Sequence, residues 1–234
     1  MNQYDNPAFF AEYAKMSRSQ YGLEGAGEWH QLEPMFPELN GKSVLDLGCG
    51  YGWHCKYAAE HGATSVLGID QSTRMIEEAT RRNTGECIEY QVCDLLNFSY
   101  PEGAYDLVVS NLVLHYVESL EEIYHLVHRT LKPGGIFLFN IEHPTFTAGL
   151  HQQFTADGTW PVTDYYYPGE RTTVFLGNEV KKYHHTLTQI LNGLLKIGFV
   201  IEVVEEAMPP EQWRDQMPEE MKRPMMLLVK AKKP

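Results

Sequence analysis

The chain has 234 residues, of which 43% are hydrophobic and 21% charged, enough for one α/β domain with a full core. No apolar run is as long as a membrane span, and the first residues lack the pattern of a signal peptide, so we expect a cytoplasmic protein without a membrane partner. The formal net charge of −12 disfavours a nucleic-acid partner, because such a partner requires a basic face. A small-molecule substrate is therefore favoured.

Cysteine and histidine patterns give no sign of a metal centre or a disulfide framework. The four cysteines form no C-x-x-C pair, and the ten histidines contain no H-E-x-x-H arrangement. We therefore predict that the protein binds no metal ion. The short basic clusters, Lys181-Lys182 among them, are interpreted as solvated surface.

The first forty residues are predicted to be helical. Apolar residues recur near the helical period over 7–30, although Gly22, Gly25 and Gly27 interrupt the pattern. A second short helix is expected from about residue 28 to residue 37.

From residue 43 onward, predicted strands and helices alternate, which is typical of a parallel sheet with helices on both faces. Residues 132–135 are predicted to form a turn, because Pro133 stops the helix before it. The expected strands are 43–47, 65–69, 88–92, 105–110 and 136–141, and the expected helices are 53–61, 72–82 with Ser72 as N-cap, and 119–130.

Residues 142–182 break this alternation and are rich in aromatic residues, Gly and Pro. An insertion of this length is more often functional than idle. Within it, 174–180 is predicted to form a hairpin around Gly177-Asn178. The chain then continues with a helix over 186–197, which ends at Gly198, and with strands over 200–205 and 225–231.

The most informative stretch is 44–55, where a short apolar strand runs into Gly48, Gly50 and Gly52. Glycines in a strand-to-helix turn allow positive φ and let a ligand approach the backbone. The dinucleotide pattern is G-x-G-x-x-G, whereas this turn is G-x-G-x-G with Asp46 two residues before the first glycine. That carboxylate would repel a pyrophosphate and attract an ammonium or sulfonium. The turn therefore suits a positively charged nucleoside without phosphates, a description that S-adenosylmethionine fits.

Further segments follow this turn at characteristic spacings: two strand ends at 68–72 and 92–94, the stretch 105–117, and the turn at 131–135. Together with the glycine turn they make the chain resemble the class I S-adenosylmethionine-dependent methyltransferases of the small-molecule type (methyltransferase type 11 or 25). The resemblance is strong over about 40–142 and looser over the last helix and the last two strands.

The resemblance implies an α/β fold with a Rossmann-like seven-stranded, mostly parallel sheet and helices on both faces. It also implies a single methyltransferase domain with an N-terminal helical lid and a segment inserted after the fifth strand. The expected parts are the lid at 1–40, a cofactor-binding core at 41–142, an inserted substrate-pocket segment at 143–185, and the C-terminal helix and strands at 186–234.

The resemblance further implies which residues bind the cofactor. Asp70 can accept hydrogen bonds from the ribose hydroxyls, and Asp94 from the adenine amino group. Met75 either packs on the adenine or belongs to the core, and Arg18 either pairs with the cofactor carboxylate or is an exposed helix charge. For Asp46 and Asp70 the alternative is strand-end capping. The expected set is Tyr13, Arg18, Asp46, Gly48, Cys49, Gly50, Asp70, Gln71, Met75, Cys93, Asp94, Leu95, Asn111 and Leu112.

Methyl transfer is an in-line displacement, so the enzyme mainly aligns the nucleophile, and a base is needed only if the acceptor must lose a proton. His115, after the fourth strand, is the first candidate, although packing or hydrogen bonding to the loop would also explain it. His143 follows the fifth strand, and His184 lies just before the last helix. Some of the aromatic side chains of Trp160 and 165–167 are expected to line the acceptor pocket.

The leading hypothesis is a methyltransferase that acts on an oxygen, nitrogen or sulfur atom of a small molecule, as a monomer or homodimer. A nicotinamide-dependent oxidoreductase is disfavoured by Asp46, by the glycine spacing and by the lack of a Tyr-x-x-x-Lys pair. A non-catalytic cofactor-binding module would keep Asp46, Gly48 and Asp70 but lack an open acceptor pocket. A nucleic-acid or protein methyltransferase is opposed by the acidic charge and by residues 110–113, which lack the N-P-P-Y pattern.

Overall fold

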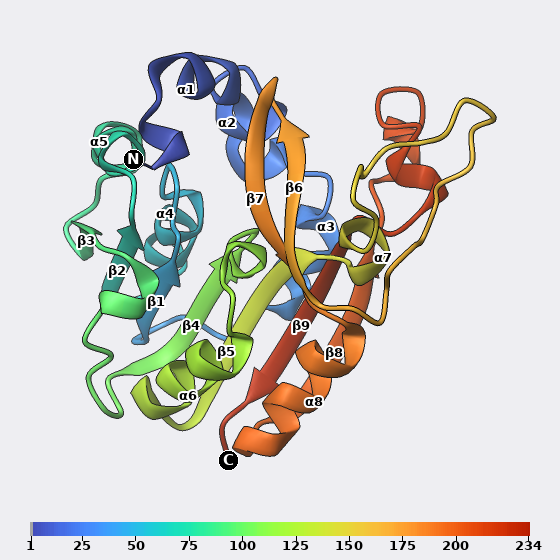
Figure 1. The fold of residues 1–234 in the computed structure, drawn as a ribbon. Helices are drawn as coiled ribbons and strands as arrows, with labels where there is room; N and C mark the ends of the chain where they lie inside the picture. The colour runs from blue at the N-terminus through green and yellow to red at the C-terminus, as the bar shows by residue number, and fades with distance from the viewer. Residues whose placement is uncertain (1) are drawn as a thin grey trace.

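The computed structural model describes residues 2–234, and its centre is a seven-stranded sheet (Figure 1). Strand β9 runs antiparallel to both of its neighbours, whereas the first five strands of the chain pair in parallel. The mostly parallel Rossmann-like sheet expected from the sequence is confirmed. The strand order is β3 (Ile88–Val92), β2 (Ser65–Asp70), β1 (Ser43–Leu47), β4 (Tyr105–Asn111), β5 (Leu131–Glu142), β9 (Met226–Lys232) and β8 (Val200–Ala207).

The helices begin and end close to the expected residues in the regular part of the chain. Ser72 caps α5 by accepting a hydrogen bond from the Met75 N–H, and Thr186 forms a capping box with Gln189 at the start of α8. The last helix ends at Gly198 as expected. The helices that accompany the sheet are α4 (Trp53–Glu60), α5 (Thr73–Arg82), α6 (Leu120–Thr130), the short α7 (Pro144–Thr147) and α8 (Leu187–Ile197).

The N-terminal segment is more broken than its apolar spacing predicts. The helical pattern over 7–30 is interrupted at Gly22, as expected, because Gly22 adopts φ +65 and ends one helix; it is also interrupted after Tyr13, where no break was expected. The elements are η1 (Gln3–Asp5), α1 (Pro7–Tyr13), α2 (Ser17–Tyr21), η2 (Gly22–Gly25), α3 (Trp29–Leu32) and η3 (Glu33–Met35).

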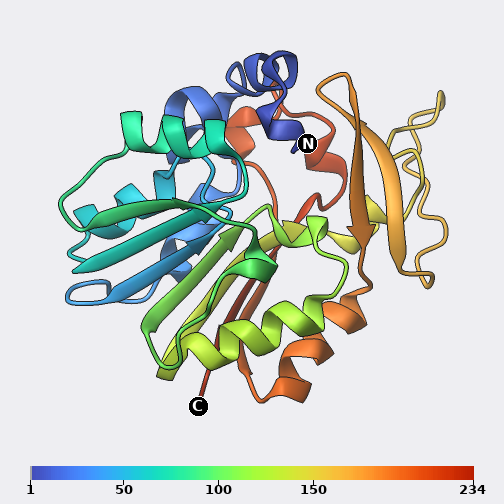
Figure 2. The same cartoon turned by 60° about the vertical axis from the view of Figure 1, so that its left-hand side comes forward.

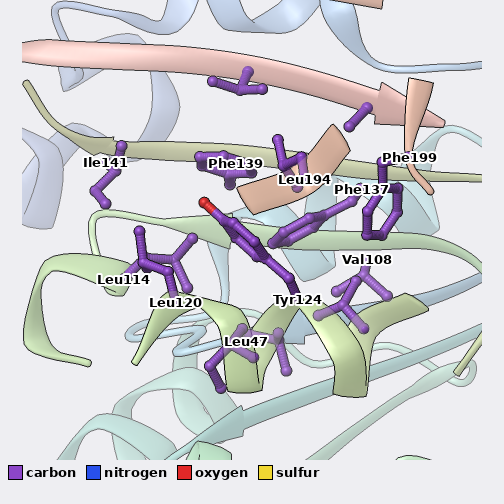
Figure 3. Packing of buried hydrophobic residues seen from close by; sticks show 14 of the residues in the cluster. Leu47, Val108, Leu114, Leu120, Tyr124, Phe137, Phe139, Ile141, Leu194 and Phe199 are labelled. Carbon is purple, nitrogen blue, oxygen red and sulfur yellow. The ribbon is translucent and has the colours of Figure 1, made fainter. Parts of the chain in front are cut away.

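Helices cover both faces of the sheet, because successive residues of a strand point to opposite sides. On one face, Leu45, Leu47, Phe137 and Phe139 are fully buried beneath α6 and α8, and Tyr124 of α6 lies among them (Figure 3). The opposite face packs against α3 and α4 through Val44, Val66, Leu107, Leu138 and Leu228.

The predicted hairpin is present as β6 (Gly169–Phe175) and β7 (Asn178–His184), which form a separate two-stranded sheet. Its turn is Leu176-Gly177, one residue earlier than predicted, because Asn178 already pairs with Phe175. Leu176 and Gly177 have φ of +50 and +75, the left-handed backbone that a tight two-residue hairpin turn requires.

The turn predicted at 132–135 is instead a bulge inside β5. Leu131 pairs with Tyr105 and Ile136 with Leu107, so the residues between them are extra on the β5 side. The helix before it ends at Thr130, ahead of Pro133.

Among residues 2–234, no helix has the length and apolar character needed to cross a membrane. The same residues contain no group of three or more His, Cys, Asp or Glu side chains placed to hold a metal ion.

Candidate active site

A cavity of about 460 Å³ lies at the carboxyl ends of the parallel strands. Its floor includes the turn after β1 and the ends of β2, β4 and β5, and its upper walls come from the N-terminal helices and the β6–β7 hairpin. Both views show these helices, in blue, and the hairpin, in orange, beyond the same end of the sheet (Figures 1 and 2). Open α/β sheets bind their ligands at this edge.

The glycine turn brings bare backbone to the cavity. Gly48, Gly50 and Gly52 have φ of +73, +53 and +78. A Cβ at Gly48 would lie 2.3 Å from Val113 Cγ2, and one at Gly52 would lie 2.2 Å from the Tyr90 hydroxyl, so both glycines are required by close packing. A Cβ at Gly50 would meet no atom within 4 Å. Gly50 therefore faces open space, as a ligand contact requires.

Asp70 ends β2 on the cavity wall. Its carboxylate accepts hydrogen bonds from the Gly50 N–H at 3.1 Å and from the Ser72 N–H at 2.8 Å, so it joins the two turns that bound this part of the cavity. Burial raises the pKa of Asp70 to about 6, against these two backbone donors, which lower it. The carboxylate is ionised at neutral pH and keeps lone pairs for further donors such as ribose hydroxyls.

The expected adenine-binding residues largely converge beside Asp70. Gln71, Met75, Asp94 and Leu95 all line the cavity. Met75, on the inner side of α5, is also buried, so it belongs to the core and to the cavity wall together. The Asp94 carboxylate accepts from the Leu96 N–H at 2.9 Å. Cys93 does not line the cavity.

Asp46 lies behind the glycine turn and not on the cavity wall. It is fully buried, accepts a hydrogen bond from the Cys55 thiol at 3.4 Å, and its Oδ1 has no hydrogen-bond partner among residues 2–234. Burial raises the pKa of Asp46 to about 7. The structure therefore places it as a support beneath the turn, whereas Cys49, three residues later, does line the cavity.

Arg18 and Tyr13, from the N-terminal helices, both line the cavity. The Arg18 guanidinium makes a two-pronged ion pair with Glu28, at 3.0 and 3.1 Å. Burial would raise the pKa of Glu28, but the Arg18 charge beside it holds that pKa below its ordinary value. Arg18 is therefore not an exposed helix charge, since its guanidinium is an ordered cation in the cavity wall that already has a protein partner.

Glu28 also joins Arg18 to the end of the sheet. The Asn140 side-chain amide donates to Glu28 at 3.3 Å and to the Asn111 side-chain oxygen at 2.8 Å. Asn111 and Leu112, both expected, line the cavity, and Leu112 adopts φ +57, a strained conformation of the kind that gathers at functional sites. Sequence reasoning missed Asn140 and Glu28, although a lone Asn inside the apolar run of the fifth strand was a usable signal.

At the far end of the cavity, three polar side chains meet from different elements: His115 from η5 (Leu114–Tyr116), Glu142 from β5 and Lys182 from β7. Lys182 Nζ lies 2.5 Å from Glu142 Oε1, and His115 Nε2 lies 3.8 Å from the same oxygen. Burial lowers the pKa of His115 to about 4, so its ring is neutral at pH 7. Lys182, interpreted from the sequence as solvated, is buried because β7 turns alternate residues inward.

Two of the three expected catalytic histidines do not reach the cavity. His143 caps α7 and lies 3.0 Å from the Glu206 carboxylate. His184 is buried between the Thr147 hydroxyl and the Tyr165 carbonyl, both at 2.8 Å from its ring nitrogens. Both imidazole rings therefore interact with protein groups away from the cavity wall.

The expected aromatic lining from the insertion is also wrong. Neither Trp160 nor any of residues 165–167 lines the cavity. Trp160 stacks on Phe146 at 5.4 Å between ring centroids, and Tyr166 is 85% exposed. The hairpin supplies the aromatic wall instead, through Phe175 and Tyr183.

Comparison with known proteins points to one family of enzymes. The profile of the family described as "Methyltransferase domain" matches residues 45–139. The solved S-adenosylmethionine-dependent methyltransferase of Mesorhizobium loti is 41% identical, with a TM-score of 0.84, over 90% of this chain and 100% of its own. A Listeria monocytogenes structure assigned to the same class is 46% identical, with a TM-score of 0.85, over 91% of this chain and 99% of its own.

More distant relatives match either nearly the whole chain or only part of it. A Haemophilus influenzae protein of unstated function is 29% identical over 98% of this chain and 96% of its own. Phosphoethanolamine N-methyltransferase 3 of Arabidopsis thaliana is 33% identical over 49% of this chain, and the match spans only 23% of that enzyme. Together with the family profile, the matches to the two solved methyltransferases, which span about nine tenths of this chain and 99–100% of theirs, show that the chain belongs to the class I S-adenosylmethionine-dependent methyltransferases and that S-adenosylmethionine is its cofactor.

Proposed function

We propose that the enzyme methylates a small-molecule acceptor in the cytoplasm, with no nucleic-acid partner. The observation that carries this proposal is the shape of the cavity. It continues from Gly50 and Asp70 to the cluster of His115 and Lys182, and walls from the N-terminal helices and the β6–β7 hairpin enclose it. A space of about 460 Å³ suits the cofactor and a compact acceptor better than a protein segment or a nucleic-acid strand.

We propose that the four parts of the chain have separate roles. Residues 41–142 bind the cofactor, 1–40 act as a lid, 143–185 complete the acceptor pocket through the hairpin, and 186–234 complete the sheet. In support, η1, α1 and α2 line one side of the cavity and β7 lines another.

Within the core, we assign the adenosine portion to Asp70, Asp94, Met75 and their neighbours, and the methionine portion to the Asn111–Leu112 corner. Arg18, already paired with Glu28, offers its remaining N–H groups to the cofactor carboxylate. Asp46 supports the turn from beneath. Bound S-adenosylmethionine supplies a methyl group on a sulfonium leaving group, so the protein needs chiefly to position the acceptor and exclude water.

The relatives do not fix the acceptor. Their names include a phosphoethanolamine N-methyltransferase, a sterol 24-C-methyltransferase and a malonyl-[acyl-carrier protein] O-methyltransferase, and each match covers about half of this chain. Since the family profile matches residues 45–139, the acceptor must be inferred chiefly from residues outside that range.

Two measurements test the proposal. Calorimetric titration should show saturable binding of S-adenosylmethionine and S-adenosylhomocysteine and none of NADH. The enzyme is then incubated with tritiated S-adenosylmethionine and a cell extract separated into small-molecule, protein and nucleic-acid fractions. Label should appear in the small-molecule fraction. Label confined to protein or nucleic acid would overturn the acceptor assignment, and binding without transfer to any fraction would favour a non-catalytic module.

A further inference from the structure

The acceptor end of the cavity holds a buried charged cluster with spare hydrogen-bonding capacity. The side chains of His115 and Lys182 are 3% and 5% exposed. Lys182 Nζ donates to Glu142 Oε1, which occupies one of its three N–H donors. Glu142 Oε2 and His115 Nδ1 are buried and have no hydrogen-bond partner among residues 2–234. Buried polar groups are ordinarily paired, so these atoms point to a ligand.

We propose that this cluster binds the acceptor through a hydroxyl group on a planar ring or enol, with Glu142 Oε2 as the proton acceptor and Lys182 Nζ as the cation that stabilises the charge left on oxygen. The enzyme is thereby an O-methyltransferase of phenol-like or enol-like molecules. This inference rests on the proposed small-molecule function and deepens it.

The combination of donor and acceptor atoms selects a hydroxyl over the other nucleophiles. A hydroxyl donates one hydrogen bond and accepts others, so it can satisfy Glu142 Oε2 and Lys182 Nζ together. An aliphatic amine is protonated at neutral pH, so it has only donors and would lie beside the Lys182 charge, and a neutral aromatic amine is a poor acceptor because its lone pair is delocalised into the ring. A carboxylate has only acceptors and would lie beside the Glu142 charge. A thiol is a weak donor and acceptor, and it would leave both buried groups poorly paired.

The neighbouring side chains favour a planar acceptor. Tyr4, Tyr116 and Phe175 line this end of the cavity, and the Tyr4 and Tyr116 hydroxyls hydrogen-bond to each other at 3.1 Å, which turns their rings into a fixed wall. Lys182 Nζ lies 5.4 Å from the Phe175 ring centroid. Acidity points the same way, because a phenol, with a pKa near 10 as in Tyr, is within reach of a carboxylate helped by an adjacent ammonium.

The atoms and electrons of the proposed step balance, because S-adenosylmethionine supplies both the methyl group and the leaving group. The O–H bond breaks and its proton passes to Glu142 Oε2, while Lys182 Nζ donates to the oxygen. The oxygen forms the new bond to the methyl carbon as the carbon–sulfur bond breaks, and the electron pair of that bond stays on sulfur. The neutral His115 ring borders Glu142 and adds no competing charge.

The test uses ring compounds that differ only in the nucleophile: 4-nitrophenol, 4-nitroaniline, 4-nitrothiophenol and 4-nitrobenzoate. Each is titrated into the enzyme saturated with S-adenosylhomocysteine, and the colour of the nitrophenolate reports ionisation of the bound phenol. We expect the phenol to bind best and to ionise at a lower pH than in free solution. With S-adenosylmethionine in place of its product, only the phenol should be methylated.

Lys182→Met should lower the ionised fraction of bound 4-nitrophenol about tenfold or more, because an adjacent cation shifts such a pKa by 1–3 units. Glu142→Gln should lower its methylation while keeping its binding. Lys181→Met and Glu170→Gln are matched controls on the same hairpin, since that pair is exposed and faces away from the cavity. If Lys182→Met fails to fold, the double variant Lys182→Met/Glu142→Gln removes both charges together.

The outcomes separate the two proposals. Binding of S-adenosylhomocysteine without preference for the phenol, or with preference for the amine, thiol or carboxylate, overturns the hydroxyl assignment and leaves the methyltransferase function intact. Unchanged ionisation of bound nitrophenol in Lys182→Met also overturns it. Failure of the wild-type enzyme to bind S-adenosylhomocysteine would instead contradict the proposed function.

Discussion

Asp70 accepts backbone hydrogen bonds from the turns on both sides of it, and it lies on the cavity wall next to Gly50. Asp70→Ala should weaken S-adenosylhomocysteine binding by about 2 kcal/mol, because hydrogen bonds to a charged group contribute roughly 1.5–3 kcal/mol. Calorimetric titration measures this loss, with Glu77→Ala on the exposed side of α5 as the control. Equal affinity in Asp70→Ala and the wild type would remove Asp70 from the site.

The same residue predicts how binding depends on pH. Since the pKa of Asp70 is raised to about 6 in the protein, the carboxyl group gains a proton as the pH falls through 6 and loses acceptor capacity. The affinity of the wild type for S-adenosylhomocysteine should therefore decline below pH 6, and this part of the decline should be absent in Asp70→Ala. Parallel pH profiles for the two proteins would contradict the assignment.

Variants at Gly50 and Gly103 separate the effect of blocking the cofactor site from the effect of straining the backbone. Both have positive φ, +53 and +58, and a Cβ at either would meet no atom within 4 Å, but only Gly50 lines the cavity. Gly50→Val and Gly103→Val should therefore lose similar stability, in the range of 1–3 kcal/mol per strained residue. Only Gly50→Val should abolish S-adenosylhomocysteine binding. Retained binding in Gly50→Val would mean that this turn is not the contact.

At the scale of elements, the N-terminal segment is attached to the cofactor-binding core through η1. The Asp5 carboxylate accepts from the Ser72 hydroxyl at 2.7 Å and from the Arg74 N–H at 3.2 Å, while the Arg74 side chain donates to the Asp5 carbonyl at 3.1 Å. These contacts lie at the start of α5, two residues after Asp70. Asp5 therefore ties the proposed lid to the turn that bounds the ribose position.

Asp5→Ala should loosen the lid without removing any residue from the cavity wall. We expect S-adenosylhomocysteine to dissociate several-fold faster and residues 2–21 to exchange amide hydrogens faster, because Asp5 makes the hydrogen bonds that hold η1 to the start of α5. Stopped-flow displacement and hydrogen exchange measure the two effects. Glu12→Ala, which removes an exposed carboxylate of α1, is the control. Unchanged dissociation in Asp5→Ala would separate the N-terminal segment from cofactor exchange.

Element boundaries could be predicted wherever local chemistry decides them, as at the Ser72 cap and at Gly198, where the last helix ends. They failed where pairing with another strand decides them. Leu131 belongs to β5 because it pairs with Tyr105, and the hairpin turn falls at Leu176 because Asn178 pairs with Phe175. The residues next to Leu131 or Asn178 in the sequence do not indicate either of these strand pairings.

At the scale of the whole molecule, most of the residues expected to bind the cofactor line the cavity, whereas most of those expected at the acceptor end do not. Asp70 and Asn111 each end a parallel strand of the sheet and Asp94 lies two residues after the end of another, so their convergence follows from topology alone. Lys182 and Glu142 are 40 residues apart and meet only because the hairpin folds back over the sheet. Such a long-range contact, formed outside the repeating α/β pattern, leaves no periodic signal.

Buried titratable groups make the stability of the whole molecule depend on pH in two opposing ways. Burial lowers the pKa of His54, His115 and His185 from 6.5 to about 4, so the unfolded chain binds more protons than the folded chain in this window. Stability should therefore fall as the pH drops from about 6.5 to 4. Asp46 acts in the opposite sense, because burial raises its pKa from 3.8 to about 7 and the folded chain binds the additional proton.

Asp46→Asn isolates this second contribution. At pH 8 the wild type bears the cost of a buried, ionised Asp46, so the variant should be more stable by on the order of 2–4 kcal/mol. The advantage should shrink as the pH falls through about 7 toward 4, where Asp46 is protonated in the wild type. Denaturant unfolding at pH 8, 6 and 5 measures it. Asp106→Asn should show the opposite sign at pH 8, because Lys132 and Ser43 overcome the effect of burial and lower the Asp106 pKa to about 2. A difference between Asp46→Asn and wild type that stays constant with pH would show that Asp46 is not the group that titrates.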